Sequence, residues 1–205
     1  MYKTLFYKFP KLIKKIFPQL LYSIENDLNE VYLTFDDGPT PEVTPQILDI
    51  LSDFNAKASF FCLGKNVLNN PDIFRTIIEN GHTIGNHSFD HLNGWKTDNF
   101  KYFQNIEKAE RLIKTDFFRP PYGKISPIQI FKLSRKYKIV MWDVLSGDFD
   151  INISKEKCVE YVLKNVKSGS IIVFHDSLKA KERVLYALPV VLDELQARGF
   201  RFARL

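Results

Sequence analysis

The chain has 205 residues, 45% of them hydrophobic, which is enough apolar material for one folded domain with a substantial core. Its net charge of +5 is mild, and no sustained basic stripe with interleaved aromatic residues is present, so composition does not indicate a nucleic-acid-binding protein. The two cysteines, Cys62 and Cys158, form no Cys-x-x-Cys metal motif, and the apolar run around Cys62 predicts a buried thiol.

The N-terminal segment differs from the rest of the chain because its lysines all precede the first acid, Glu25. We predict a basic amphipathic segment over residues 1–28 and a folded domain over residues 29–205. A helix packed on the domain is the favoured interpretation, and a segment lying on an anionic membrane is the alternative. No uninterrupted apolar run is long enough for a transmembrane helix. Lysines, Pro10 and Pro18 interrupt any signal-peptide core and no small-residue cleavage site follows, so the expected location is the cytoplasm or a peripheral position on a membrane.

From residue 31 onwards, short apolar runs alternate with segments of helical spacing. The predicted strands are Val31–Phe35, Ala58–Leu63, His82–Gly85, Phe117–Phe118, Ile139–Trp142, Ser170–Phe174 and Phe200–Arg204. The predicted helices are Pro45–Phe54, Pro71–Glu79, Asn99–Lys114, Ile128–Tyr137, Lys155–Val166 and Val184–Ala197. This alternation predicts an α/β fold of about seven parallel strands covered by helices, with its chemistry at the carboxyl ends of the strands.

Two adjacent carboxylates, Asp36 and Asp37, follow the first predicted strand, and Gly38-Pro39 turns the chain directly after them. A polar turn with solvated acids is the simpler interpretation. Adjacent acids repel each other, however, and a cation at a strand end would relieve that repulsion. The pair therefore favours a cation site but does not establish one.

Two histidines four residues apart follow the predicted strand His82–Gly85. We expect His87 and His91 to lie on one side of a helical turn, close enough to share a metal ion. Surface or capping histidines explain a bare His-x-x-x-His about as well. An Asp from another strand end would complete three protein ligands with an open fourth position, which is typical of catalytic zinc.

Three later segments also adjoin predicted strands. Arg119 precedes two prolines that fix the backbone, and it is either a surface residue or the partner of a carboxylate. Asp148 and Phe149 follow the strand Ile139–Trp142, where acids and aromatic residues suit a sugar groove or the core equally well. His175 ends the strand Ser170–Phe174, and its position on the same predicted rim makes it a candidate acid.

Together and in this order, these segments resemble the polysaccharide deacetylase family, also called the NodB-homology domain or carbohydrate esterase family 4. The flanking residues 56–61 and 81–87 match as well, and the resemblance covers roughly residues 31–205. It implies that residues 29–205 are a catalytic domain with a distorted, TIM-barrel-like (β/α) barrel, usually of seven strands. It also implies one divalent metal ion, most often zinc, with cobalt or manganese as alternatives.

The resemblance assigns the metal and the base to particular residues. Asp37, His87 and His91 correspond to the metal ligands of the family. Asp36 corresponds to the catalytic base, and Arg119 to the residue that braces it.

The remaining roles follow from the resemblance in the same way. Asp148 corresponds to the residue that orients the general acid, His175, and the backbone N–H of Tyr122 to a donor for the oxyanion. The residues expected to line the substrate groove are Val173, Phe149 and Pro121.

The implied activity is hydrolysis of the acetamide of an N-acetylated sugar in a peptidoglycan- or chitin-like glycan. Phe149 stands where the family often has Trp, and Leu145 stands where many members carry Asp, which leaves the substrate open rather than the chemistry. The alternatives are an O-acetyl esterase or amidase with the same site, a sugar-binding relative without activity, and a membrane-surface protein acting through residues 1–24. The sequence does not indicate the oligomeric state.

Overall fold

The structure of the chain, a computed structural model, describes residues 16–25 and 27–205. The predicted N-terminal helix and its membrane contact fall largely outside these residues, so both stay predictions, as does the boundary after residue 28. The core of the fold is one sheet with the strand order β1-β6-β5-β4-β3-β2-β8-β7, and β9 pairs with β2. All of these strand pairs are parallel, which confirms the predicted fold class.

The predicted number of seven strands was too low, because the described residues form a nine-stranded sheet. The strands are β1 (Leu20–Leu21), β2 (Glu30–Asp36), β3 (Ser59–Cys62), β4 (Thr83–Asn86), β5 (Phe117–Phe118), β6 (Lys138–Val140), β7 (Val144–Leu145), β8 (Ile171–His175) and β9 (Arg201–Ala203). All of the predicted runs form strands, and the additional ones are β1 and β7. Each spans only two residues, which is too short for its apolar pattern to be distinctive.

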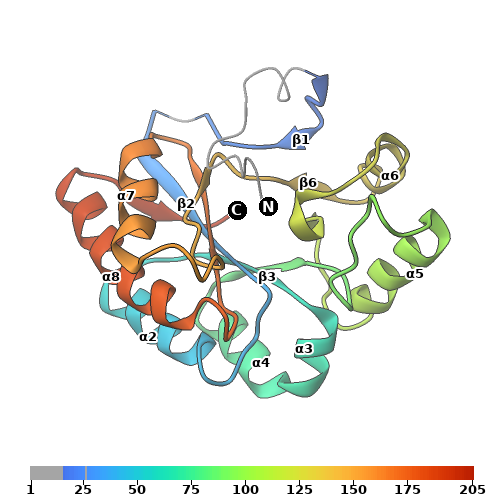
Figure 1. Cartoon of the computed structure of the whole chain (residues 1–205), viewed down its shortest axis with the longest axis horizontal. Helices are drawn as coiled ribbons and strands as arrows, with labels where there is room; N and C mark the ends of the chain where they lie inside the picture. The colour runs from blue at the N-terminus through green and yellow to red at the C-terminus, as the bar shows by residue number, and fades with distance from the viewer. Residues whose placement is uncertain (1–15, 26) are drawn as a thin grey trace.

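Seven helices and one 3₁₀ turn surround the sheet in the described part of the chain. They are α2 (Thr44–Asp53), α3 (Gly64–Asn69), α4 (Pro71–Glu79), α5 (Asn99–Glu110), η1 (Pro121–Gly123), α6 (Pro127–Leu133), α7 (Lys155–Asn165) and α8 (Lys181–Ala197). Figure 1 shows them as a ring, with α7 and α8 on one side and α5 and α6 on the other. The short helix α3 was not predicted. None of the helices in the described ranges is long and apolar enough to cross a membrane.

Local hydrogen bonds explain where several helices begin. Ser126 and Gln129 form a capping box at the start of α6, in which each side chain accepts from the other residue's backbone N–H. Ser154 caps α7 and Asp98 caps α5, each by accepting the backbone N–H three residues later. These residues satisfy N–H groups that the first helical turn cannot, so the helix starts follow from short-range sequence.

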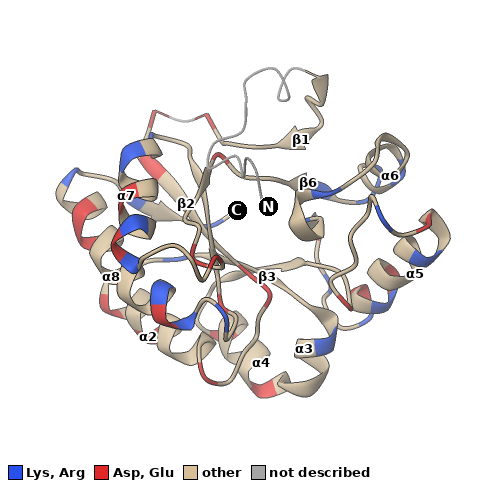
Figure 2. Ribbon diagram, in the orientation of Figure 1, with Lys and Arg blue, Asp and Glu red and all other residues tan. Residues whose placement is uncertain are grey.

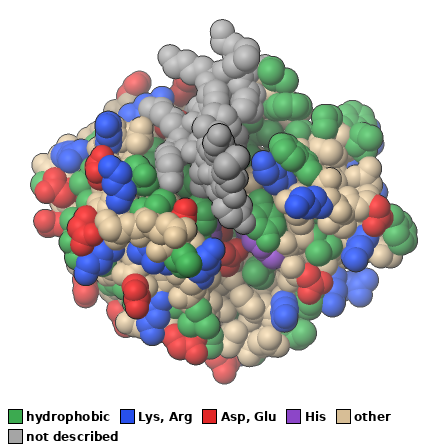
Figure 3. All heavy atoms as spheres, viewed as in Figure 1, with side chains coloured by type: hydrophobic (Ala, Val, Ile, Leu, Met, Phe, Trp, Pro, Cys, Tyr) green, Lys and Arg blue, Asp and Glu red, His purple; other side chains and the backbone are tan. Residues whose placement is uncertain are grey.

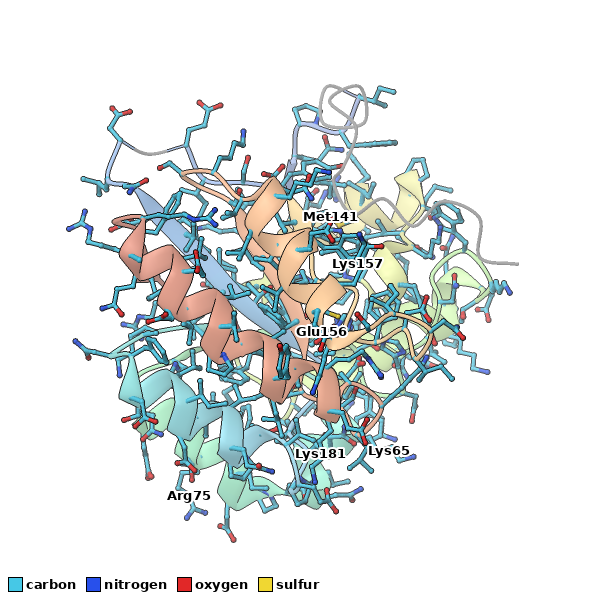
Figure 4. The ribbon with its side chains drawn as sticks, turned by 60° about the vertical axis from the view of Figure 1, so that its left-hand side comes forward. Lys65, Arg75, Met141, Glu156, Lys157 and Lys181 are labelled. Carbon is cyan, nitrogen blue, oxygen red and sulfur yellow. The ribbon has the colours of Figure 1, made fainter. Side chains whose placement is uncertain are left out.

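The main apolar core lies between the central strands and the outer helices. Phe35 on β2 stacks on Phe60 of β3 and Phe174 of β8, with ring centroids 4.9 and 6.0 Å apart. Helices α7 and α8 pack side by side on this core (Figures 1 and 4). Cys62 and Cys158 are buried in it as free thiols, as predicted for Cys62.

Residues 20–24 link β6, on one side of the curled sheet, to the start of β8, on the other. Leu20 and Leu21 pair with β6 rather than continuing the helical pattern expected of them. Ser23 then forms an antiparallel bridge with Ser170, directly before β8. The segment therefore spans the opening between β6 and β8, and the sheet forms a distorted (β/α) barrel.

Candidate metal centre and active site

The parallel register brings several strand ends to one rim of the barrel. Asp36, the last residue of β2, lies opposite His175 of β8 and opposite Phe61 of β3. Cys62 of β3 in turn lies opposite Asn86, the last residue of β4. The loops that follow β2, β4 and β8 therefore leave the sheet side by side, and Figure 2 shows acidic residues on loops near the centre of this view.

Asp37, His87 and His91 meet at this rim. One ligand atom from each residue lies within 4.8 Å of the others. Asp37 Oδ1 is 3.7 Å from His87 Nε2 and 3.2 Å from His91 Nε2. The same Oδ1 is buried and has no hydrogen-bond partner among the described residues. An unsatisfied buried carboxylate oxygen facing two imidazoles fits a divalent metal ion, because buried polar atoms otherwise find partners.

The histidines are held in the form that binds metal. His87 Nδ1 lies 2.7 Å from the backbone carbonyl of Arg119, which places the proton on Nδ1 and leaves the lone pair on Nε2. Burial lowers the pKa of His87 to about 3, and burial also lowers the pKa of His91. Both rings are therefore neutral near pH 7, as a metal ligand must be.

The segment His87–His91 is not the helical turn that was predicted. Ser88 and His91 have positive φ angles of 67° and 59°. Asn86 Oδ1 accepts the backbone N–H of Ser88, and Asn105 Oδ1 accepts the two N–H groups that follow. Side chains thus satisfy donors that a helix would pair along its own backbone, and the two imidazoles meet through a loop.

Asp36 is fixed by a fully buried arginine. Arg119 Nη1 donates to Asp36 Oδ1 at 2.7 Å and to Thr34 Oγ1 at 2.8 Å. Its Nε and Nη2 donate to the carbonyls of Val140 and Met141. With all three nitrogens bonded, the guanidinium is rigid, and it holds the Asp36 carboxylate beside the metal cluster.

His175 is paired with a buried carboxylate. Asp148 Oδ1 lies 2.8 Å from His175 Nδ1, and Asp148 Oδ2 accepts the backbone N–H of the same residue at 2.7 Å. Burial opposes the charged imidazole, but the Asp148 carboxylate outweighs it, and the pKa of His175 rises to about 9. The imidazole is therefore protonated near neutral pH.

Tyr122 lies against the metal cluster in a conformation unusual for its residue type. Its φ angle is 60°, and its ring centroid lies 4.4 Å from that of His91. The preceding residue, Pro121, is buried at the start of η1. The structure thus places Tyr122 at the rim where the sequence predicts it, and the oxyanion role of its backbone N–H stays a prediction.

A groove of about 470 Å³ opens beside Asp37 and His91. Figure 3 shows histidine and acidic surface side by side in a hollow near the centre of this face. The other groove residues come from the loops after β2 and β8 and from the α3 region: Pro39, Thr40, Pro41, Glu42, Leu63, Asn66, Asn70, Ser177, Leu178 and Lys179.

The residues predicted to line the groove lie elsewhere around the site. Phe149 packs edge-on against His175 with ring centroids 5.0 Å apart. Val173 is buried in β8, two residues before His175, and Pro121 is buried beside Tyr122. Contact of these three residues with a substrate stays a prediction.

Sequence reasoning missed the side chains that hold the loop carrying Asp37. Asp176 accepts the backbone N–H of Gly38 at 2.9 Å and the hydroxyl of Thr44 at 2.7 Å. Asn66 donates to the carbonyl of Asp37 at 2.6 Å. Asp176 had a visible signal, because it directly follows His175 at the end of a buried strand. Asn66 had none, because it lies on the short helix α3.

Comparison with known proteins was made by sequence and by structure. A family model described as "Polysaccharide deacetylase" matches residues 24–141, more than half of the chain. A peptidoglycan-N-acetylglucosamine deacetylase of Bacillus cereus is 35% identical over 189 residues, which cover 88% of either chain. A chitooligosaccharide deacetylase of Azorhizobium caulinodans is 34% identical over 197 residues, which cover 86% of this chain and 93% of the relative.

The fold is similar to that of a solved structure as well. The crystal structure of a peptidoglycan N-acetylglucosamine deacetylase aligns with a TM-score of 0.87 at 35% identity, covering 91% of both chains. The match includes nearly the whole barrel rather than one motif.

Proposed function

Because the chain belongs to the polysaccharide deacetylase family and its relatives include peptidoglycan and chitooligosaccharide deacetylases, we propose that it removes acetyl groups from N-acetylglucosamine units of a peptidoglycan- or chitin-like glycan. One observation carries this proposal. The three-residue metal cluster lies at the same rim of the barrel as a carboxylate held by Arg119 and an imidazole held by Asp148. A metal site flanked by a base and an acid is the arrangement that amide hydrolysis requires.

Zinc is the metal ion that we propose for the cluster. Two imidazoles and one carboxylate suit zinc and leave a position open, although cobalt and manganese accept the same ligands. When bound, such an ion polarises the acetyl carbonyl and lowers the pKa of a water molecule.

Asp36 accepts the proton of the attacking water in this proposal. It is adjacent in sequence to the ligand Asp37, and its carboxylate is held by the buried guanidinium of Arg119. Because Arg119 is bonded on every nitrogen, Asp36 needs no reorientation before it takes the proton.

His175 donates the proton to the leaving amine. Its Nδ1 is bonded to Asp148, so Nε2 is the nitrogen that exchanges the proton. The raised pKa of about 9 keeps the imidazole protonated before the C–N bond breaks. The Tyr122 N–H is proposed to stabilise the oxyanion that precedes this step.

Acetate release tests the function. N-acetylglucosamine oligomers, peptidoglycan fragments and O-acetylated xylan are incubated with the protein, with chelator, and with chelator followed by zinc. We expect acetate and free amine from the N-acetylated glycans, loss with chelator and recovery with zinc. Release from xylan alone would replace the proposal with an O-acetyl esterase, and release that is unaffected by chelator would contradict the metal site.

A further inference from the structure

Four large apolar side chains are exposed on the α5–α6 side of the barrel. Trp95, Phe100, Ile128 and Phe131 are 64%, 73%, 64% and 65% exposed. Together with the cations of this region, Lys124, Lys132 and Arg135, we call them the α6 surface. Single exposed apolar residues are common, but a group on adjoining segments indicates an interaction site.

Hydrogen bonds show that the segments of the α6 surface adjoin. The buried side chain of Gln129 on α6 donates to the carbonyl of Gly94 and to the side chain of Asn99. Trp95 Nε1 donates to the carbonyl of Ile125, two residues before the start of α6. The loop with Trp95, the start of α5 with Phe100 and the start of α6 with Ile128 are therefore held together.

The charge of this region has one sign over a long stretch. Residues 117–142 contain six Lys or Arg residues and no Asp or Glu. Figure 2 shows Lys and Arg without acids along β6 and α6. Arg119 is buried and Lys136 pairs with Glu110, so Lys124, Lys132 and Arg135 supply the positive charge of the α6 surface. Such a surface is complementary to an anionic partner.

Two of the cations lie over aromatic rings of this surface. Lys124 Nζ is 4.0 Å from the centroid of Trp95, and the Arg135 guanidinium is 4.5 Å from that of Phe131. One face of each of these two rings is therefore covered by a cation. Ile128 has no ring to stack, and a purely anionic polymer would not require exposed apolar side chains. A lipid surface uses both features, because apolar side chains enter it while cations meet its phosphates.

We propose that the α6 surface docks the protein on an anionic membrane. In Figure 3, hydrophobic side chains gather over α6 at the upper right, with basic side chains beside them. The loop with Trp95 follows His91, and α6 follows Tyr122, so docking holds the rim of the barrel near the lipid headgroups. The docking does not depend on the proposed deacetylase activity.

Vesicle sedimentation of the full chain tests the contribution of the apolar side chains of the α6 surface to membrane binding. We expect binding to phosphatidylglycerol–phosphatidylcholine vesicles, and the double variant Ile128→Ser/Phe131→Ser should lose at least about tenfold in partition coefficient. The matched control is Leu68→Ser/Ile78→Ser, which removes exposed apolar side chains from α3 and α4 and should bind like wild type. Thermal unfolding of each variant should match wild type, which excludes a folding defect. Equal binding by the α6 variant and wild type would overturn the proposal.

A second pair of variants tests the contribution of the cations of the α6 surface to membrane binding. Lys132→Gln/Arg135→Gln should weaken binding, whereas Lys155→Gln/Lys164→Gln on α7, across the ring in Figure 1, should not. Wild-type binding should fall with added salt and be absent from pure phosphatidylcholine vesicles. Equal binding to neutral vesicles would contradict the docking mode. Binding to soluble polyglutamate that survives Ile128→Ser/Phe131→Ser, without vesicle binding, would assign the surface to a polyanion instead.

Discussion

Residues with positive φ angles occur at both ends of the parallel sheet, but the residue types differ between the two ends. At the amino end, just before the strands, the residues with positive φ are Asn29, Asn55, Gly81, Gly169 and Gly199. Asparagine and glycine adopt this conformation at little cost. The amino end therefore turns the chain with residues suited to turning.

At the carboxyl end, the residue type suits the chemistry of its side chain rather than the turn, and the backbone adopts a positive φ angle despite that residue type. The non-glycine residues with positive φ there are Asp37, Ser88, His91 and Tyr122. Ser and Tyr gain nothing from this conformation, and a strained residue costs on the order of 1–3 kcal/mol. Two of the four are metal ligands in our proposal, and Tyr122 contacts one of them. Backbone strain is therefore concentrated at the carboxyl end of the sheet, where we propose that the reaction takes place.

The largest expected effect comes from removing a metal ligand at the carboxyl end. His91→Asn keeps a residue that tolerates the positive φ angle but removes the imidazole. Loss of a residue that only supports a metal ligand lowers metal affinity by up to about 100-fold. Loss of the ligand itself should therefore lower metal affinity by more than about 100-fold, and turnover should be lost with it. Metal content after dialysis, measured by elemental analysis, checks this. Full occupancy in the variant would remove His91 from the ligand set.

The next effect separates the base from the metal. Asp36→Asn should lower kcat by about 10²–10⁴-fold while metal content stays near wild type. The variant should also unfold at lower temperature, because the buried Arg119 loses its counter-charge. Activity is therefore normalised to folded protein. Near-normal kcat would contradict the assignment of Asp36 as the base.

The amino end should respond in stability rather than in turnover. His82 is buried, and its Nδ1 accepts the backbone N–H of Ala58. Burial lowers the pKa of His82 to about 4, below its ordinary 6.5. In the folded protein His82 stays neutral down to about pH 4, whereas in the unfolded chain it takes up a proton near pH 6.5. The free energy of unfolding therefore falls by about 3 kcal/mol as the pH is lowered from above 6.5 to 4.

Urea unfolding from pH 7.5 to 4 measures this effect. His82→Asn keeps an acceptor for Ala58 without a titrating ring, so its stability should change less across this range than that of wild type. Parallel curves for the two proteins would show that His82 does not titrate as proposed.

The smallest expected effect tests the support of the Asp37 loop. Asp176→Ala removes the acceptor of the Gly38 N–H and should weaken metal binding about tenfold. Thr44→Val removes the hydroxyl that donates to Asp176 but keeps the bond to Gly38, so its effect should be smaller. Metal titration by calorimetry compares the two variants. A larger loss in Thr44→Val would assign the support to the threonine.

Much of the barrel could be predicted from the sequence because its signals are local. The apolar run of β2 and the Pro71–Glu79 helix are properties of neighbouring residues, and the observed bounds of that helix agree with the prediction. Predictions from residue spacing were wrong where contacts with distant segments determined the local structure. Leu20 and Leu21 looked helical but pair with β6, because the open sheet edge offers more hydrogen bonds than an isolated turn.

The sequence by itself determined which side chains are available and in what order they follow the strands. Only the tertiary structure decided how they meet. Asp36 faces His175 because of strand register, and Gly38 is held by a side chain 138 residues away. His87 and His91 come together through a loop held by Asn86 and Asn105, since interactions between distant segments replaced the expected helical turn. Spacing along the chain fixes local periodicity, but the geometry of a site depends on contacts that close only when the barrel folds.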